Sequence, residues 1–143
     1  MHDRLVYVSR AAPGIGARDA YDIIRVSHNH NSRFGLTGAL ILIDGHFLQV
    51  LEGDPFQVRT RYARIAADPR HTNLELRQST RIAQLSFASE WMALRHDDGI
   101  DAPTRQAHGY APGFPPDRFD GDRLVAFVSA CCRAHLDGQR LAS

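Results

Sequence analysis

The sequence predicts an α+β fold, and two features of the 143-residue chain carry that prediction. Two apolar runs, residues 39–43 and 47–51, flank Asp44-Gly45, a dipeptide that favours a two-residue hairpin turn. On each side of this hairpin lies a segment whose apolar residues recur at helical spacing. Helices that alternate with strands in this way form a layered domain, and the chain is long enough for one such domain.

The first half of the chain predicts a strand, a helix and the hairpin. Residues 5–9 (LVYVS) are β-branched and aromatic, and this predicted strand ends at a Pro-Gly turn. Residues 17–32 predict an amphipathic helix whose apolar stripe turns polar at its C-terminal end. Residues 39–43 are apolar at every position, which indicates that both faces of the sheet are covered.

The second half begins with Asp54-Pro55, an N-cap and a first-turn proline, and the helix that they start ends at Asp68-Pro69. Residues 74–82 predict a fourth strand, and residues 91–94 predict the start of a fifth. The resulting order, β-α-β-β-α-β-β, is that of a ferredoxin-like sheet with an added strand and two helices on one face.

Composition changes near residue 95. Residues 96–123 are rich in Asp, Gly and Pro, which is typical of a connector. Residues 124–136 (LVAFVSACCRAHL) have a helical period and too much apolar surface for a helix that stands alone in water. We therefore expect a main domain over residues 1–95, and a connector with a C-terminal helical cap on the other face of the sheet over residues 96–143.

Charge and composition disfavour several classes of function. Lys and Arg number 17 against 16 Asp and Glu, so no strong field attracts nucleic acid or an anionic membrane. No apolar run approaches the roughly 20 residues that span a bilayer, and the N-terminal residues lack the order of a signal peptide, so we expect a cytoplasmic protein. Cys131 and Cys132 are adjacent, and we expect both to be reduced helix residues.

Three motifs with known chemistry fail on inspection. The Gly14-Ile-Gly16 turn lacks the third glycine of a dinucleotide-binding loop, since Asp19 occupies that position. His28 and His30 stand at i and i+2, whereas metal ligands on a helix are found at i and i+4, so we expect no metal site. No nucleophile elbow of a hydrolase is present in the sequence.

Polar residues stand at positions whose neighbours predict burial, namely Tyr7, His30 with Asn31, Gln49, and the turn at residues 64–68. An unpaired buried hydroxyl or amide costs about 1–3 kcal/mol, so Tyr7 and Gln49 each need a partner. The first and third strands are neighbours in a ferredoxin-like sheet, which makes a Tyr7–Gln49 hydrogen bond feasible. For each residue alone, a satisfied core position remains an alternative. Together they indicate a gap between the two helices that fits a flat ligand with a polar edge.

Five segments follow one another along the chain: LVYVSRA, NSRFGLTGALI, DGHFLQVLEG, YARIAADPRH and F-x-x-x-W-M. They resemble the successive motifs of the BLUF family, blue-light sensors that use a flavin. The resemblance covers residues 4 to about 95, and FLQ-x-LEG with YARI-x-x-DPRH is a specific pair of signals. It implies a non-covalent flavin, FAD ahead of FMN, between the two helices with its isoalloxazine ring toward the sheet.

The resemblance also implies roles for the matching residues. Tyr7 matches the family's photochemical tyrosine, and Gln49 matches the glutamine between that tyrosine and the flavin. Asn31 matches the asparagine that hydrogen-bonds the polar edge of the ring, and His30 matches the neighbouring position. The other implied contacts pack around the ring or lie near its edge and side chain: Ile23, Ser27, Phe47, Ile65, Arg64, Asp68 and His71.

The end of the match departs from the family pattern. Met92 keeps the family methionine's distance after Phe87, and the resemblance makes it part of the switch. The tryptophan of the usual F-x-x-W-x-M is replaced by Glu90, and Trp91 stands one position later. Because neighbours on a strand point to opposite faces, Trp91 has two interpretations: a member of the switch, or a side chain packed under the C-terminal helix.

The resemblance implies a photoreceptor and not an enzyme. Light would drive a hydrogen-bond switch among Tyr7, Gln49 and the flavin, without consuming a substrate. The signal would pass to a separate protein partner, still unidentified, or through a homo-oligomer. Two alternatives remain: a regulatory or binding module of the same fold without photochemistry, and an acylphosphatase-like enzyme, for which Arg10 before Ala-Ala-Pro is a poor phosphate loop.

Overall fold

The computed structural model describes residues 2–15, 17–43, 45–86, 93–96, 103, 108 and 120–142. Its strands are β1 His2–Ala11, β2 Thr37–Ile43, β3 His46–Gly53, β4 His71–Ile82 and β5 Ala93–His96. They form one sheet in the order β4-β1-β3-β2-β5, in which only β2 and β5 are parallel neighbours. The predicted ferredoxin-like sheet with an added strand is therefore confirmed.

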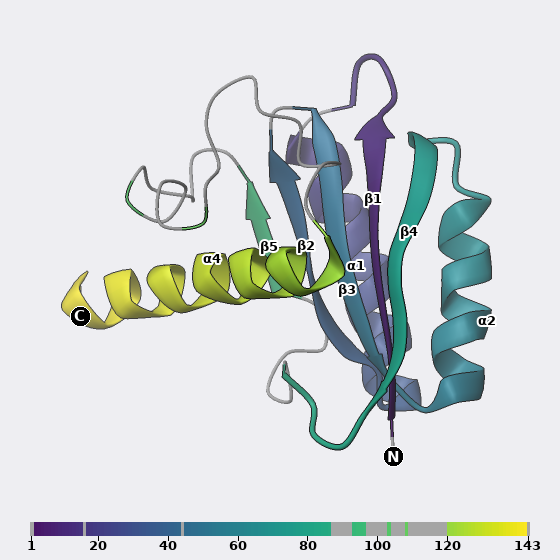
Figure 1. The fold of residues 1–143 in the computed structure, drawn as a ribbon. Helices are drawn as coiled ribbons and strands as arrows, with labels where there is room; N and C mark the ends of the chain where they lie inside the picture. The colour runs from purple at the N-terminus through teal and green to yellow at the C-terminus, as the bar shows by residue number, and fades with distance from the viewer. Residues whose placement is uncertain are drawn as a thin grey trace.

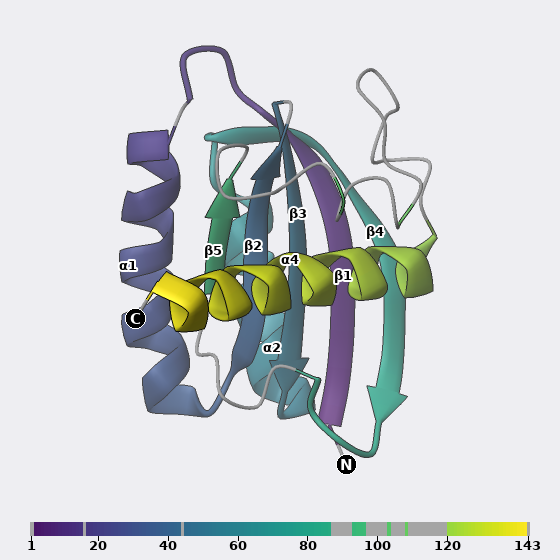
Figure 2. The same cartoon turned by 90° about the vertical axis from the view of Figure 1, so that its left-hand side faces the viewer.

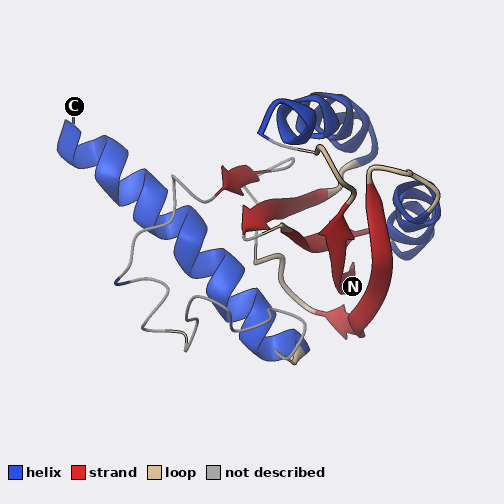
Figure 3. Cartoon of the chain, turned by 90° about the horizontal axis from the view of Figure 1, so that it is seen from above, coloured by secondary structure: helices blue, strands red, loops and turns tan. Residues whose placement is uncertain are grey.

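Helices cover both faces of this sheet (Figure 1). The helices α1 Ala17–Phe34 and α2 Pro55–Ala66 lie on one face. The helix α4 Gly121–Ala142 runs across the strands on the opposite face (Figure 2), and the view from above separates the three layers (Figure 3). The C-terminal segment thus occupies the face where the sequence predicted it.

Two clusters of buried side chains follow from the alternation of side chains along the strands. On the α4 side, Val8 and Ile41 pack with Phe127 of the helix. On the other side, Leu5 and Leu40 pack with Val58 of α2. Every residue of β2 is buried because the strand lies between these two cores, as its continuous apolar sequence predicted.

Local signals fix the ends of the two helices beside the site. Asp54 caps α2, since its side chain accepts a hydrogen bond from the backbone N–H of Gln57 at 3.1 Å. At the end of α1, Gly35 has φ +69°, and the backbone N–H of Leu36 donates to the carbonyl of Asn31 at 3.0 Å. This is the arrangement of a glycine C-cap, and it places Asn31 in the last turn of the helix.

The observed elements are longer than their predicted cores. The strand predicted over residues 74–82 begins at His71, and the helix predicted over 17–32 continues to Phe34.

Other sequence predictions concern single residues. Gly45 has the positive φ, +76°, that the hairpin turn needs, while Asp44 and residues 87–92 lie outside the described residues. Cys131 is a buried, reduced cysteine on α4. None of the helices within the described ranges is long and apolar enough to cross a membrane.

Candidate functional site

A pocket of about 140 Å³ opens between α1 and α2 above the sheet. Its walls come from α1, β2, β3, α2 and the turn that follows α2. The residues that line it are Ile23, Val26, Leu40, Phe47, Gln49, Arg61, Arg64, Ile65, Asp68 and Arg70. The gap that the sequence predicted between the polar ends of the two helices therefore exists.

Tyr7 and Gln49 lie side by side at the sheet side of this gap. The two residues are direct partners in the β1–β3 register, and they are 2% and 4% exposed. The Tyr7 ring packs against Tyr62 of α2 in an edge-to-face contact, with 5.1 Å between ring centroids. Its buried hydroxyl has no hydrogen-bond partner among the described residues. The predicted adjacency of Tyr7 and Gln49 is thus confirmed. The predicted hydrogen bond between them is not formed in this structure, in which the phenol ring packs against α2.

Burial also sets the protonation of Tyr7. Desolvation raises the pKa of the phenol well above its usual value of 10.0, while the charge of Arg61 acts in the opposite direction. The phenol is therefore neutral at physiological pH and keeps its proton. The hydroxyl of a neutral phenol can donate a hydrogen bond, and that of Tyr7 has no acceptor among the described residues.

His30 and Asn31 lie near the C-terminal end of α1. Asn31 is fully buried, and the His30 ring packs against Phe34 with 4.7 Å between centroids. The Nε2 atom of His30 is buried and has no hydrogen-bond partner in the described part of the chain. Burial, followed by the charges of three nearby arginines, lowers the pKa of His30 below 6.5, so the ring is neutral at pH 7.

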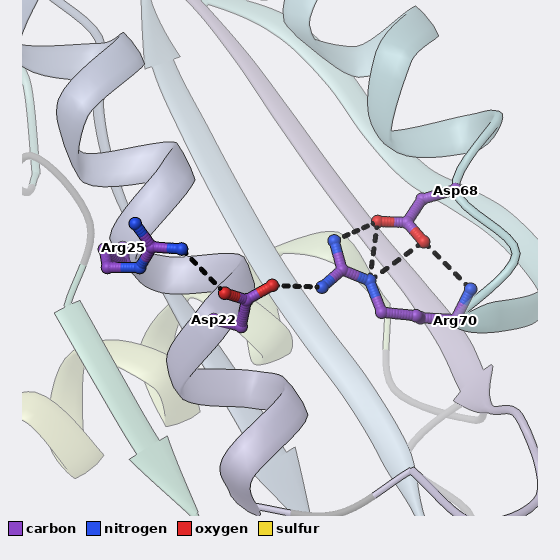
Figure 4. A network of polar contacts seen from close by, with 4 residues as sticks. All are labelled: Asp22, Arg25, Asp68 and Arg70. Carbon is purple, nitrogen blue, oxygen red and sulfur yellow. Dashed lines mark hydrogen bonds and ion pairs between the residues drawn. The ribbon is translucent and has the colours of Figure 1, made fainter.

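A chain of charges links α1 to the turn after α2 (Figure 4). The guanidinium of Arg70 donates to Asp68 Oδ2 at 2.6 Å and to Asp22 Oδ2 at 3.1 Å. Asp22 in turn accepts a hydrogen bond from Arg25 at 2.9 Å, which together with Arg70 holds the pKa of this carboxyl below its usual value. Arg70, which lines the pocket, therefore ties α1 to the turn after α2.

The predicted site residues fall into three groups. Six of them line the pocket together: Ile23, Phe47, Gln49, Arg64, Ile65 and Asp68. Tyr7, His30 and Asn31 are buried or half-buried nearby without lining it. The side chains of Ser27 and His71, and the whole of Trp91 and Met92, lie outside the described residues.

Sequence reasoning missed four of the lining residues, the apolar Val26 and Leu40 and the charged Arg61 and Arg70. The signal for Arg70 was present, because it belongs to the DPRH motif whose Asp68 was chosen. Arg61 stands three residues after Val58, so helical spacing places it on the inward side of α2. Arginine is almost never buried unless it is paired, so the residue type of Arg61 did not indicate a buried position.

Comparison with known proteins decides the family. Residues 3–93 match the family described as sensors of blue light using FAD, BLUF. The chain belongs to the BLUF family. The match includes the whole of the pocket described above and ends at the first residue of β5.

Two curated relatives contain the BLUF match within much longer chains. The photoactivated adenylate cyclase subunit beta of Euglena gracilis is 33% identical over 87 residues, which are 61% of this chain and 10% of the subunit. The blue light- and temperature-regulated antirepressor BluF of Escherichia coli (strain K12) is 31% identical over 70 residues, 49% of this chain and 17% of the antirepressor. The chain thus spans only a small part of the length of either relative.

Two solved structures match nearly their whole length. BlrB, a BLUF protein in its dark state, has a TM-score of 0.73 at 26% identity and covers 93% of this chain and 96% of its own. The photo-activated state of BlsA has a TM-score of 0.79 at 25% identity, with 90% and 92% covered. Because this coverage exceeds residues 3–93, the likeness continues beyond the BLUF domain toward α4.

Proposed function

We propose that the chain is a blue-light photoreceptor that binds FAD between α1 and α2 and senses light through Tyr7 and Gln49. One observation carries the proposal: the buried Tyr7 hydroxyl has no hydrogen-bond partner among the described residues, and Tyr7 is paired in the sheet with Gln49, which lines the pocket. An unpaired buried hydroxyl costs about 1–3 kcal/mol, so its position indicates a ligand that completes the site.

The residues present fit a flavin. Ile23, Phe47 and Ile65 give the pocket apolar walls for a flat ring system. The Tyr7 hydroxyl and His30 Nε2 are buried polar atoms for which the described part of the chain offers no partner, and a ligand whose pyrimidine edge carries both donors and acceptors would suit them. Asn31, at the capped end of α1, would orient that edge. Ser27, Arg64, Asp68 and His71 would lie near the ring edge and the ribityl chain.

In this proposal the bound flavin supplies the group that absorbs blue light and becomes a strong oxidant. Tyr7 holds its phenolic proton in the dark, since a phenol is protonated at neutral pH and burial raises its pKa further. Gln49 has two donors and one acceptor on a single amide, so rotation of that amide reverses its hydrogen bonds without moving the backbone. Tyr7 would give up an electron and a proton on illumination, and Gln49 would relay the proton and change its hydrogen bonds.

The light signal would leave the site through the far side of the sheet. Residues 1–95 would form the flavin-binding domain, and residues 96–143 a connector and helical cap that receives the change through Met92 and, in one of its two placements, Trp91. The relatives are named as a photoactivated cyclase subunit and a light-regulated antirepressor, so in each of them light controls an output. For this chain we propose a separate protein partner or a second copy as the receiver, in the cytoplasm, with no substrate consumed.

Gln49→Leu tests the switch apart from the pocket. Leucine has about the volume of glutamine but no hydrogen-bonding atoms, so the variant should still bind FAD and should show no red shift of the flavin absorption after blue light. Binding is measured by flavin fluorescence, and the shift by absorption before and after illumination. A normal red shift in Gln49→Leu would remove Gln49 from the mechanism and favour a different switch.

A further inference from the structure

Arg61 is a buried cation inside the flavin pocket that the proposed mechanism does not use. It is 9% exposed and is one of two buried residues of α2, the other being Val58 one turn earlier. It lines the pocket together with Gln49, and the next residue along the helix, Tyr62, packs on the ring of Tyr7. Arg61 therefore lies in the same space as both members of the switch.

The charges around the pocket do not balance. Among the described residues that line the pocket, three are arginines, Arg61, Arg64 and Arg70, and one, Asp68, is acidic. That carboxylate is bound by Arg70, which also takes Asp22 of α1. The pocket as a whole therefore carries positive charge, and Arg61 is the most deeply buried part of it.

A buried guanidinium is costly unless negative charge lies or develops near it. Burial lowers the pKa of Arg61, and the negative charges of a Tyr7 phenolate and of Asp68 act against that change. A fixed cation in a site of low dielectric stabilises whatever group there becomes more negative. Flavin becomes more negative on reduction, and a phenol does so when it loses its proton.

We propose that Arg61 is the fixed counter-cation of the flavin pocket: it raises the reduction potential of the bound flavin and thereby sets how readily Tyr7 donates an electron. The inference rests on the proposed function, because it requires a flavin in the pocket. With a flavin bound, Tyr7 would donate one electron to it, Gln49 would pass on the phenolic proton, and both would return to Tyr7 in the dark. Arg61 would transfer neither the electron nor the proton and would act only through its charge.

The test is the reduction potential of bound FAD in darkness, measured by equilibration with a reference dye. Arg61→Gln should shift this potential to more negative values. The ratio of affinities for reduced and oxidised FAD should fall by at least about tenfold, as expected for a unit charge several ångströms away in a protein site. Arg61→Lys keeps the charge and should keep the potential close to that of the wild type.

Arg64→Gln is the matched control, because Arg64 lines the same pocket on the same helix but is exposed. Its charge is screened by solvent, so its shift should be smaller and should vanish in high salt, whereas that of Arg61→Gln should persist. A potential unchanged in Arg61→Gln, or changed equally in Arg61→Lys, would overturn the role of the charge. A wild-type protein that binds no FAD would overturn the proposed function itself, so the two failures are distinguishable.

Discussion

Removing the cation of a buried ion pair should cost this fold several kilocalories per mole. Glu52 on β3 is 0% exposed, and its Oε2 accepts a hydrogen bond from Arg4 Nε of β1 at 2.8 Å. Its Oε1 accepts the backbone N–H of Ser86, also at 2.8 Å, and Arg4 donates to the Ser86 hydroxyl at 2.6 Å. One carboxylate thus holds together two strands and the segment after β4.

Arg4→Met keeps the aliphatic stem and removes the charge. Deleting one partner of a buried pair typically costs about 3–5 kcal/mol, because the other charge is left without compensation. Here the Ser86 N–H still binds the carboxylate, so we expect a loss of about 3 kcal/mol, near the lower end of that range.

Urea unfolding of the wild type and the variant, followed by circular dichroism, gives the difference in free energy. Arg81→Met is a suitable control, since Arg81 is exposed, its contact with the buried Asp3 is long at 3.9 Å, and Asp3 keeps its contact with Arg59 at 3.7 Å. We expect this variant to lose about 0–1 kcal/mol. Adding Glu52→Met to Arg4→Met should recover stability, because the buried charge is then gone. A loss below about 1 kcal/mol in Arg4→Met would refute this reasoning.

Two further predictions concern the site. Tyr7→Phe without flavin should be as stable as the wild type or more stable, by up to about 1–3 kcal/mol in urea unfolding, because it removes a buried hydroxyl that has no partner in the described ranges. With FAD bound it should show no light-induced red shift. A clear loss of stability would indicate a hydrogen bond at that hydroxyl. The pKa of His30 in the folded protein lies below the value of 6.5 that the unfolded chain has. As the pH falls through 6.5, the unfolded chain therefore binds a proton that the folded protein does not yet bind, and this destabilises the fold. Stability should fall as the pH drops from 7 to below 6.5, and His30→Gln should reduce this slope; an unchanged slope would contradict it.

The fold could be predicted because its signals are local and agree with one another. The Asp54-Pro55 cap, the hairpin glycine and the two amphipathic helices fixed the order of the elements, and the apolar sequence of β2 required cover on both faces. Two elements are longer than predicted: β4 begins at His71 and α1 continues to Phe34. Their ends depend on strand pairing and helix capping, which cannot be read from sequence periodicity.

The site could be predicted only in part. Register and alternation placed Tyr7 opposite Gln49, since both depend on backbone geometry alone. The direction of the Tyr7 phenol depends on how α2 packs against the sheet, because the ring contacts Tyr62 of that helix. Helical spacing from Val58 places Arg61 on the inward side of α2, but its burial results from how the helix packs against the sheet, which the sequence pattern does not give.

The most direct test of the proposed photoreceptor is the visible absorption spectrum of the FAD-loaded protein in darkness, immediately after blue illumination, and after return to darkness. We expect a flavin spectrum that shifts to the red with light and returns in the dark. A flavin spectrum that illumination leaves unchanged would contradict the switch, and a protein that takes up no FAD would contradict the site as well.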